Sequence, residues 1–320
     1  MDNNHPNDQN FAALYGNLNT DEQLAFDLIW ELEHTDPAYA PAEQPQGYVL
    51  GGQPGSGKSR LQKIASSEVG GNLIIANGDA YRRYHPDFEA IQVKHHDDSP
   101  KYTAEFSGKM TQLVIAKALE NKYNLLVEGT FRTAETPLKT LKQMTDSGYD
   151  THVMVKTCPK EVSWANTGKR YQAMIAAGET PRHTDQAHHD LVVNVLADNA
   201  DLVFKEGPMG DFRVYNYDGI LFNKQHSGAA ELPGNVIYAE LHNVSAYKQC
   251  VQNYDQALSK APSAVAAQIK QLETALDISC EDLPAQERIQ KKIKFYSVRL
   301  ESELAQETKN VNNINSRPSL

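Results

Sequence analysis

The sequence has few cysteines and no long apolar segment. Its three cysteines, Cys158, Cys250 and Cys280, are far apart and odd in number, so they indicate neither a disulfide framework nor a metal-binding pair. No apolar run approaches the ~20 residues needed to span a bilayer. Residues 1–10 lack the basic and apolar segments of a secretory signal. These absences predict a cytoplasmic protein that does not associate with membranes.

Dense runs of lysine and arginine are also missing. The formal net charge is −10, from 31 basic and 41 acidic residues. A protein that binds a polynucleotide usually presents a basic surface, because neutralised phosphates release counterions. We therefore expect a small-molecule substrate and no nucleic-acid partner. The balance of 40% hydrophobic and 22% charged residues is that of an ordinary globular protein.

The stretch "YVLGGQPGSGKSRL" (48–61) has the spacing of a phosphate-binding P-loop, G-x-x-x-x-G-K-[ST]. In such a loop the glycines let the backbone approach an anion, which the N–H groups and the following helix dipole then bind. Lys58 is expected to reach the β- and γ-phosphates of a nucleoside triphosphate, and the Ser59 hydroxyl to coordinate Mg²⁺. The nucleotide-binding residues are expected to be Gly52, Gln53, Pro54, Gly55, Ser56, Gly57, Lys58 and Ser59.

Apolar runs alternate with helical patterns from residue 48 onward, which predicts an α/β fold. We expect a P-loop kinase-type parallel sheet flanked by helices, with its strand ends and the following loops at one edge. The expected strands lie around 48–50, at 72–77, 124–130 and 151–157, and at 211–219, where the pattern fits a strand or a hairpin.

The chain is expected to divide into a disordered N-terminus (1–18), a P-loop kinase domain (19–225), a C-terminal helical extension (226–310) and a disordered tail (311–320). The extension either packs against the kinase core, or binds a partner or restrains the enzyme.

Two further local patterns bear on this organisation. Thr20 and Gln23 are expected to form a capping box that starts a helix over 20–33, with Leu24, Leu28, Ile29 and Leu32 on its buried face. Residues 81–101 are polar and are expected to form a loop, before a helix over 104–121.

Polar residues follow the second and third expected strands. Asp79 comes just after the second strand, where a carboxylate can accept the proton of an attacking hydroxyl; alternatively it caps a helix or forms a turn. Glu128, Thr130 and Arg132 alternate at the end of the third strand and are candidates for binding a polar acceptor. The alternative is that Glu128 only orders the water molecules around Mg²⁺ and that Arg132 is a solvated pairing partner.

Two arginines lie near a helix end and the loop that follows it. Arg170 in "TGKRYQAM" and Arg182 in "GETPRHT" are candidates for closing over the transferring phosphate. The alternative is that both are solvated surface residues.

In order and spacing, "VLGGQPGSGKSRL", "NGDAYRRYHPDF", "YNLLVEGTFRTAETPLKT" and "GKRYQAMIAAGETPR" resemble the zeta toxin family of kinases. The resemblance covers roughly residues 48–218. Zeta toxins are the toxic halves of epsilon/zeta toxin–antitoxin pairs. They phosphorylate a sugar hydroxyl of UDP-N-acetylglucosamine, and so deplete or poison a precursor of cell-wall synthesis.

The resemblance implies a specific enzyme: an ATP- and Mg²⁺-dependent UDP-N-acetylglucosamine kinase, held in check by an epsilon-type antitoxin. It implies the catalytic residues Lys58, Asp79, Arg170 and Arg182, and the acceptor-binding residues Glu128, Thr130 and Arg132. One departure is Lys169, which stands where the family usually has an acid before the arginine. A kinase for another UDP-sugar or small molecule, and a nucleotide-binding regulator without catalysis, are the alternatives.

Overall fold

The structure is a computed structural model that describes residues 10–176, 183–228 and 231–246. The chain divides into two compact units. The first consists of residues 1–167 and 182–243. The second consists of residues 168–181 and 244–320, of which residues 168–176 and 244–246 are described. Most of the predicted C-terminal extension and all of the predicted tail lie outside the described residues.

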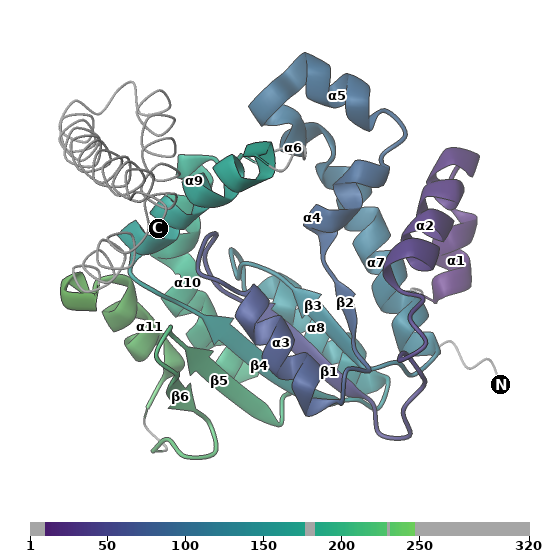
Figure 1. Ribbon diagram of the computed structural model, residues 1–320. Coiled ribbons are helices and arrows are strands. Elements are labelled where there is room, and N and C mark those ends of the chain that lie inside the picture. Colours follow the sequence, from purple (N-terminus) through teal and green to yellow (C-terminus); the bar gives the residue numbers. More distant parts are fainter. Residues whose placement is uncertain (1–9, 177–182, 229–230, 247–320) are drawn as a thin grey trace, which may run out of the picture. The chain divides into compact units, whose positions relative to one another are not determined.

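The first unit is built on a six-stranded sheet in the order β2-β3-β1-β4-β5-β6 (Figure 1). Strands β1 to β5 are parallel and β6 pairs antiparallel with β5, so the predicted α/β fold with a P-loop kinase-type parallel sheet is confirmed. The pattern over 211–219 belongs to a hairpin rather than to a single strand. The strands are β1 (Gln46–Gly51), β2 (Ile74–Ala76), β3 (Leu125–Glu128), β4 (Asp150–Lys156), β5 (Asp211–Tyr215) and β6 (Ile220–Asn223).

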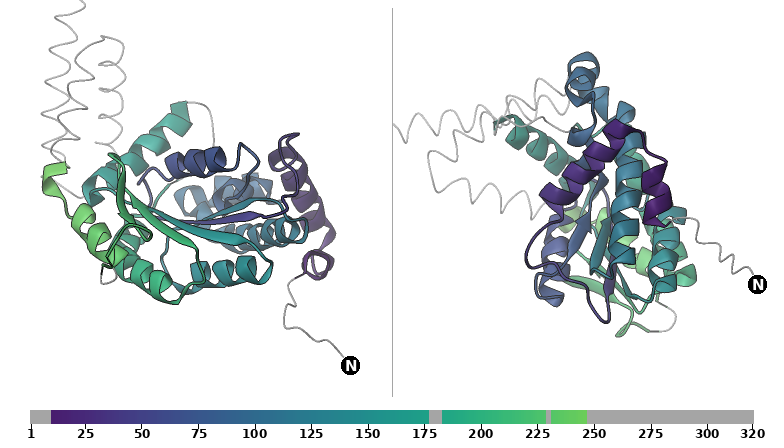
Figure 2. Two further views of the ribbon diagram at one scale, coloured as in Figure 1. Left: turned by 90° about the horizontal axis from the view of Figure 1, so that it is seen from below. Right: turned by 90° about the vertical axis from the view of Figure 1, so that its right-hand side faces the viewer.

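Helices cover both faces of this sheet (Figure 2). Side chains alternate along β1, so they pack on both faces of the sheet. Tyr48 and Leu50 pack with Leu61 of α3, whereas Val49 belongs to the hydrophobic cluster of the opposite face. Helices α7, α8, α10 and α11 contribute to that second cluster. The helices are α1 (Phe11–Gly16), α2 (Thr20–Glu33), α3 (Ser59–Glu68), α4 (Gly78–Tyr81), α5 (Phe88–His95), α6 (Ser99–Tyr102), α7 (Ala104–Glu120), α8 (Glu135–Asp146), α9 (Lys160–Ala176), α10 (Gln186–Glu206) and α11 (Pro233–Leu241).

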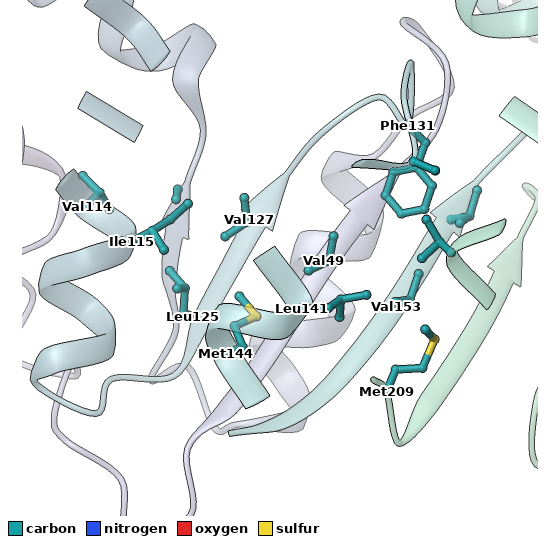
Figure 3. Packing of buried hydrophobic residues seen from close by; sticks show 14 of the residues in the cluster. Val49, Val114, Ile115, Leu125, Val127, Phe131, Leu141, Met144, Val153 and Met209 are labelled. Atoms are coloured by element: carbon teal, nitrogen blue, oxygen red, sulfur yellow. The ribbon is translucent and has the colours of Figure 1, made fainter. Parts of the chain in front are cut away.

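The larger cluster fixes the central strands relative to one another. Leu141 and Met144 of α8 are buried in it with Val49, Val127 and Val153, which are aligned on β1, β3 and β4 (Figure 3). Burial of each such side chain contributes about 1.5–3 kcal/mol. This packing holds in place the carboxyl ends of β1 and β3, which lead into the P-loop and into the segment with Thr130 and Arg132.

The N-terminal region differs from the prediction in two ways. Residues 11–16 form α1 instead of being disordered, because Phe11 and Tyr15 pack against Phe26 with ring centroids 5.4 and 5.9 Å away. Residues 1–9 lie outside the described residues. In α2 the capping box is formed by Asn19 and Glu22, one residue earlier than predicted.

The buried face of α2 is also displaced from the predicted one. Ala25, Phe26 and Ile29 are buried, whereas Leu24 and Leu32 are more than half exposed. Of the four residues predicted to share the buried face, Ile29 is the one that is fully buried. Three aromatic side chains, Phe26 with Phe11 and Tyr15, determine which face packs, and leucine spacing alone did not reveal this.

Two segments predicted to be irregular or separate are helical parts of the first unit. The segment 81–101 contains α5, two short 3₁₀ turns and the start of α6, and no residue of α5 is buried, which explains the weak apolar signal. Helix α11 belongs to the first unit because Ile237 and Leu241 are fully buried in its core. This unit therefore extends to residue 243, past the predicted boundary at 225. Among the residues described, no helix is both long and apolar enough to cross a membrane.

Candidate active site

The P-loop connects β1 to α3 and lies tightly against the segment after β4. Gly52 has φ +139°, and a Cβ added there would lie 2.2 Å from the carbonyl oxygen of Lys156. Gly55 has φ +78°, and a Cβ there would lie 2.0 Å from the carbonyl oxygen of Ser163 in α9. These two positions require glycine, both for the backbone conformation and for the close approach. The loop is thus held in one shape at the N-terminus of α3, where backbone N–H groups favour an anion.

Lys58 folds back over this loop. Its Nζ donates hydrogen bonds to the carbonyl oxygens of Gly52 at 3.0 Å and Gln53 at 3.4 Å. The same ammonium lies 3.9 Å from Oε1 of Glu128, and both side chains are largely buried. Its charge is thereby directed toward the loop and the end of β3.

Glu128, the last residue of β3, is held by amides from two other elements. Oε2 of Glu128 accepts hydrogen bonds from Nε2 of Gln62 on α3 at 2.6 Å and from Nδ2 of Asn77 at 2.9 Å. The other oxygen faces Lys58. The carboxylate is therefore fixed between the P-loop and the segment that carries Asp79.

Asp79 lies in the first turn of the short helix α4. The side chain of Asn77 caps this helix by accepting a hydrogen bond from the backbone N–H of Asp79 at 3.0 Å, so the alternative that Asp79 is the cap is wrong. Oδ1 of Asp79 accepts a hydrogen bond from Nε of Arg82 at 3.1 Å, and the carboxylate is about half exposed. Arg82 is held in turn by the carbonyl of Pro100 and the hydroxyl of Thr103. Asn77 thus connects Glu128 to Asp79.

The segment after β3 turns sharply instead of continuing the strand. Phe131 has φ +56°, in the left-handed region, where its carbonyl accepts a hydrogen bond from Nδ2 of Asn199 at 2.9 Å. Its ring is buried against Gly51. Strand alternation therefore does not extend to Thr130 and Arg132. The alternate spacing of Glu128, Thr130 and Arg132 does not by itself place their side chains on one side of the sheet. A left-handed Phe is the kind of backbone strain that clusters at functional sites.

Arg132 and Asp79 both act electrostatically on His188 in the first turn of α10. Burial lowers the pKa of His188, the Arg132 guanidinium lowers it further, and the carboxylates of Asp185 and Asp79 oppose this shift. One imidazole is thus within electrostatic range of two predicted site residues. The structure therefore gathers Lys58, Glu128, Asp79 and Arg132 at the carboxyl edge of the sheet.

The two arginines predicted to contact phosphate are not placed by this geometry. Arg170 is an exposed residue of α9 in the second unit. Arg182 lies outside the described residues. Their predicted roles stay predictions.

Several polar residues of the site carry little or no signal in a sequence. Gln62 and Asn77 hold Glu128, although neither belongs to the P-loop pattern. Asn166 of α9 donates to the carbonyl of Gly55 at 3.1 Å and to the hydroxyl of Tyr217 at 2.9 Å. Lys156 ends β4 beside the P-loop and is fully buried. A charged residue at the end of an apolar strand was the one available hint for Lys156.

Comparison with known proteins gives consistent results for sequence and structure. Residues 31–227 match the family model described as Zeta toxin. Toxin zeta of Streptococcus pyogenes is 35% identical over 202 residues, which cover 63% of this chain and 70% of that protein. Toxin PezT of Streptococcus pneumoniae serotype 4 is 30% identical over 245 residues, which cover 75% of this chain and 96% of PezT.

A solved structure from a study of the PezAT chromosomal toxin–antitoxin system of Streptococcus pneumoniae is similar in fold. It superposes with a TM-score of 0.61 at 25% sequence identity, and the match covers 71% of this chain and 88% of the other.

Proposed function

This chain belongs to the zeta toxin family, and on that basis we propose that it is an ATP-dependent kinase that phosphorylates a sugar hydroxyl of UDP-N-acetylglucosamine. The observation that carries the proposal is the unbroken polar connection from Lys58 to Glu128, Asn77 and Asp79. It joins a phosphate-binding loop to a half-exposed carboxylate, which are the two parts that phosphoryl transfer to a hydroxyl requires.

Each side chain has a definite task in this reaction. The P-loop N–H groups and Lys58 bind the triphosphate and orient the γ-phosphoryl group. Asp79 accepts the proton of the acceptor hydroxyl. At the same time the hydroxyl oxygen bonds to the γ-phosphorus, and the bond between the γ-phosphorus and the β-phosphate oxygen breaks. Glu128, Thr130 and Arg132 bind the acceptor, through hydrogen bonds to its hydroxyls and ionic contact with its phosphates.

Mg²⁺ is the metal that suits this donor set. Ser59 is an exposed residue at the start of α3, and the Glu128 carboxylate lies 3.9 Å from Nζ of Lys58. Mg²⁺ prefers such hard oxygen ligands and usually takes only one or two from protein, with phosphates and water completing its shell. When bound, it neutralises charge on the phosphate oxygens. Ser59 would hold it through its hydroxyl oxygen.

We further propose that the chain is the toxin of a toxin–antitoxin pair with an epsilon-type antitoxin protein as its partner. Two of its relatives are named toxin zeta and toxin PezT, and its structural neighbour comes from a toxin–antitoxin system. Depletion of a cell-wall precursor would account for toxicity.

A second candidate function is favoured by one contact. The hydrogen bond from Arg82 to Asp79 engages the carboxylate that should accept the proton. If the Arg82–Asp79 pair persists when ATP and the acceptor are bound, the chain is a nucleotide-binding regulator rather than a kinase.

The decisive experiment measures ATP consumption with and without a panel of UDP-sugars, with products identified by mass spectrometry. We expect UDP-N-acetylglucosamine to stimulate ATP consumption and to gain one phosphoryl group. Lys58→Ala should abolish both that activity and growth inhibition, whereas Lys63→Ala, which removes an exposed lysine from α3, should not. Stimulation by another UDP-sugar would identify that sugar as the substrate instead. ATP binding without turnover on any acceptor would favour the nucleotide-binding regulator.

A further inference from the structure

Lys156 is a buried lysine that has no part in the reaction described so far. It is the last residue of β4 and is 0% exposed. Alternation along β4 directs Val153 and Val155 to the large core and Met154 to the α3 face. Lys156 follows Met154 on the α3 face, where its Cε lies 3.9 Å from the position a Cβ would take at Gly57.

The surroundings of this ammonium stabilise its positive charge only in part. In the part of the chain that the structure describes, Nζ of Lys156 has no hydrogen-bond acceptor. The charge lies near the N-terminus of α3, which is the positive end of the helix dipole. An ammonium buried without an acceptor is costly for a fold to keep. Its position beside the P-loop suggests that it is retained for an anion.

The charged groups around Lys156 offset the effect of its burial only in part. Burial lowers the pKa of Lys156 to about 8. Cys158, Glu240 and Asp218 oppose this shift, whereas the Arg60 guanidinium reinforces it. An anion bound at the loop would supply the negative charge that Lys156 lacks.

Tyr217 keeps this lysine in place. Nζ of Lys156 lies 4.3 Å from the centroid of the Tyr217 ring. The ring is fixed from two sides, since its hydroxyl accepts a hydrogen bond from Asn166 at 2.9 Å and its backbone carbonyl accepts one from Arg60 at 2.7 Å. The ring also lies beside Gly57, with atoms 3.6 and 3.7 Å from a Cβ added there. Lys156 is therefore confined between the Tyr217 ring and the end of the P-loop.

We propose that Lys156 is a second lysine of the nucleotide site, which attracts the α- and β-phosphates of a nucleoside di- or triphosphate from behind the P-loop. This inference rests on the proposed nucleotide binding. Lys58 serves the β- and γ-phosphates from the front of the loop, so the two lysines act on overlapping parts of one phosphate chain. Lys156 is a binding and positioning residue and takes no proton from the acceptor.

The test compares Lys156→Met with Lys160→Met, which removes an exposed lysine at the start of α9. ADP and adenosine are titrated calorimetrically at pH 7, and unfolding midpoints are measured without ligand. We expect Lys156→Met to weaken ADP binding roughly tenfold or more, because a buried charge near the phosphates is lost. Its adenosine affinity should not change, and its unfolding midpoint should stay equal or rise, because an unpaired buried charge is removed. Lys160→Met should resemble the wild type.

The outcomes separate this inference from the proposed function. A folded Lys156→Met variant that binds ADP as tightly as the wild type overturns the role of Lys156 and leaves the kinase proposal intact. Failure of the wild type to bind ADP or ATP overturns the kinase proposal itself. If Lys156→Met does not fold, Lys156→Gln takes its place in the same titrations, and a folded Lys156→Gln variant that binds ADP as tightly as the wild type overturns the inference.

Discussion

Replacement of Gly55 by alanine is expected to destabilise the folded protein more than the same replacement at Gly148. The two glycines have nearly identical backbones, with φ +78° and +79°. A residue with a Cβ costs about 1–2 kcal/mol in this left-handed region, so this part of the cost is shared. Their surroundings differ. A Cβ at Gly148 would have nothing within 4 Å, whereas at Gly55 it would lie 2.0 Å from the carbonyl oxygen of Ser163.

The difference between the two variants can be estimated from that contact. Ordinary van der Waals contact begins near 3.4 Å, so the P-loop and the first turn of α9 must separate by more than 1 Å to admit the methyl group. Overpacking of this kind costs about 1–3 kcal/mol. We therefore expect the free energy of unfolding to fall by about 2–5 kcal/mol for Gly55→Ala, and by about 1–2 kcal/mol for Gly148→Ala.

Urea denaturation of the wild type and both variants measures these losses, and ADP titration supplies a second readout. Gly55→Ala should also lose ADP affinity because the loop is displaced, while Gly148→Ala should bind ADP normally. Equal losses of stability in the two variants would refute the reasoning, since they would show that the contact with Ser163 does not require glycine at position 55.

Three further predictions test other parts of the site and of the fold. Asp79→Asn should lower turnover by roughly two to four powers of ten with ATP affinity nearly unchanged, because the amide cannot take the proton. An equally large loss of ATP affinity, measured by calorimetry, would show that Asp79 has a structural role. Glu128→Ala should weaken UDP-N-acetylglucosamine binding by about 1–3 kcal/mol, and an equal loss for ATP with Mg²⁺ would place Glu128 in the metal shell. Burial lowers the pKa of His34 to about 4, and its Nε2 bonds the Tyr81 hydroxyl at 2.9 Å. The folded state therefore favours neutral His34, so stability is full above pH ~6.5 and should fall by about 2 kcal/mol from pH 7 to pH 5. Urea denaturation of His34→Gln should show that this part of the pH dependence is gone.

The fold could be predicted from the sequence where one local signal determines one element. The P-loop pattern lies between β1 and α3 as expected, and the apolar runs became the parallel strands. The face of α2 could not be predicted in this way. The true cap, Asn19, precedes the expected one by one residue, and the aromatic side chains of α1 decide which side of the helix is buried.

The positions of Glu128 and Asp79 at the edge of the sheet could be predicted from the sequence, and the residues that hold them could not. Glu128 ends a strand, Asp79 follows one, and both carry charge, so they could be found by position. Gln62 and Asn77 could not, because an amide gains a role only when two loops and a helix meet. The sharp turn at Phe131 was also hidden, since it depends on burial of the ring against Gly51 and on a hydrogen bond from α10.

The position of β1 in the sheet has a consequence for the order in which this protein is completed during synthesis. Both strands that flank β1 come later in the chain: Tyr48 is aligned with Leu126 and with His152, roughly 80 and 100 residues downstream. Until β4 has left the ribosome, the strand before the P-loop lacks one neighbour, and Lys156 and Ser163 are not available to support the loop. Pairing between such distant segments is slow compared with local helix formation. A nascent chain that already carries the complete P-loop sequence therefore cannot yet hold a nucleotide, and the binding site forms only after most of the first unit has been made.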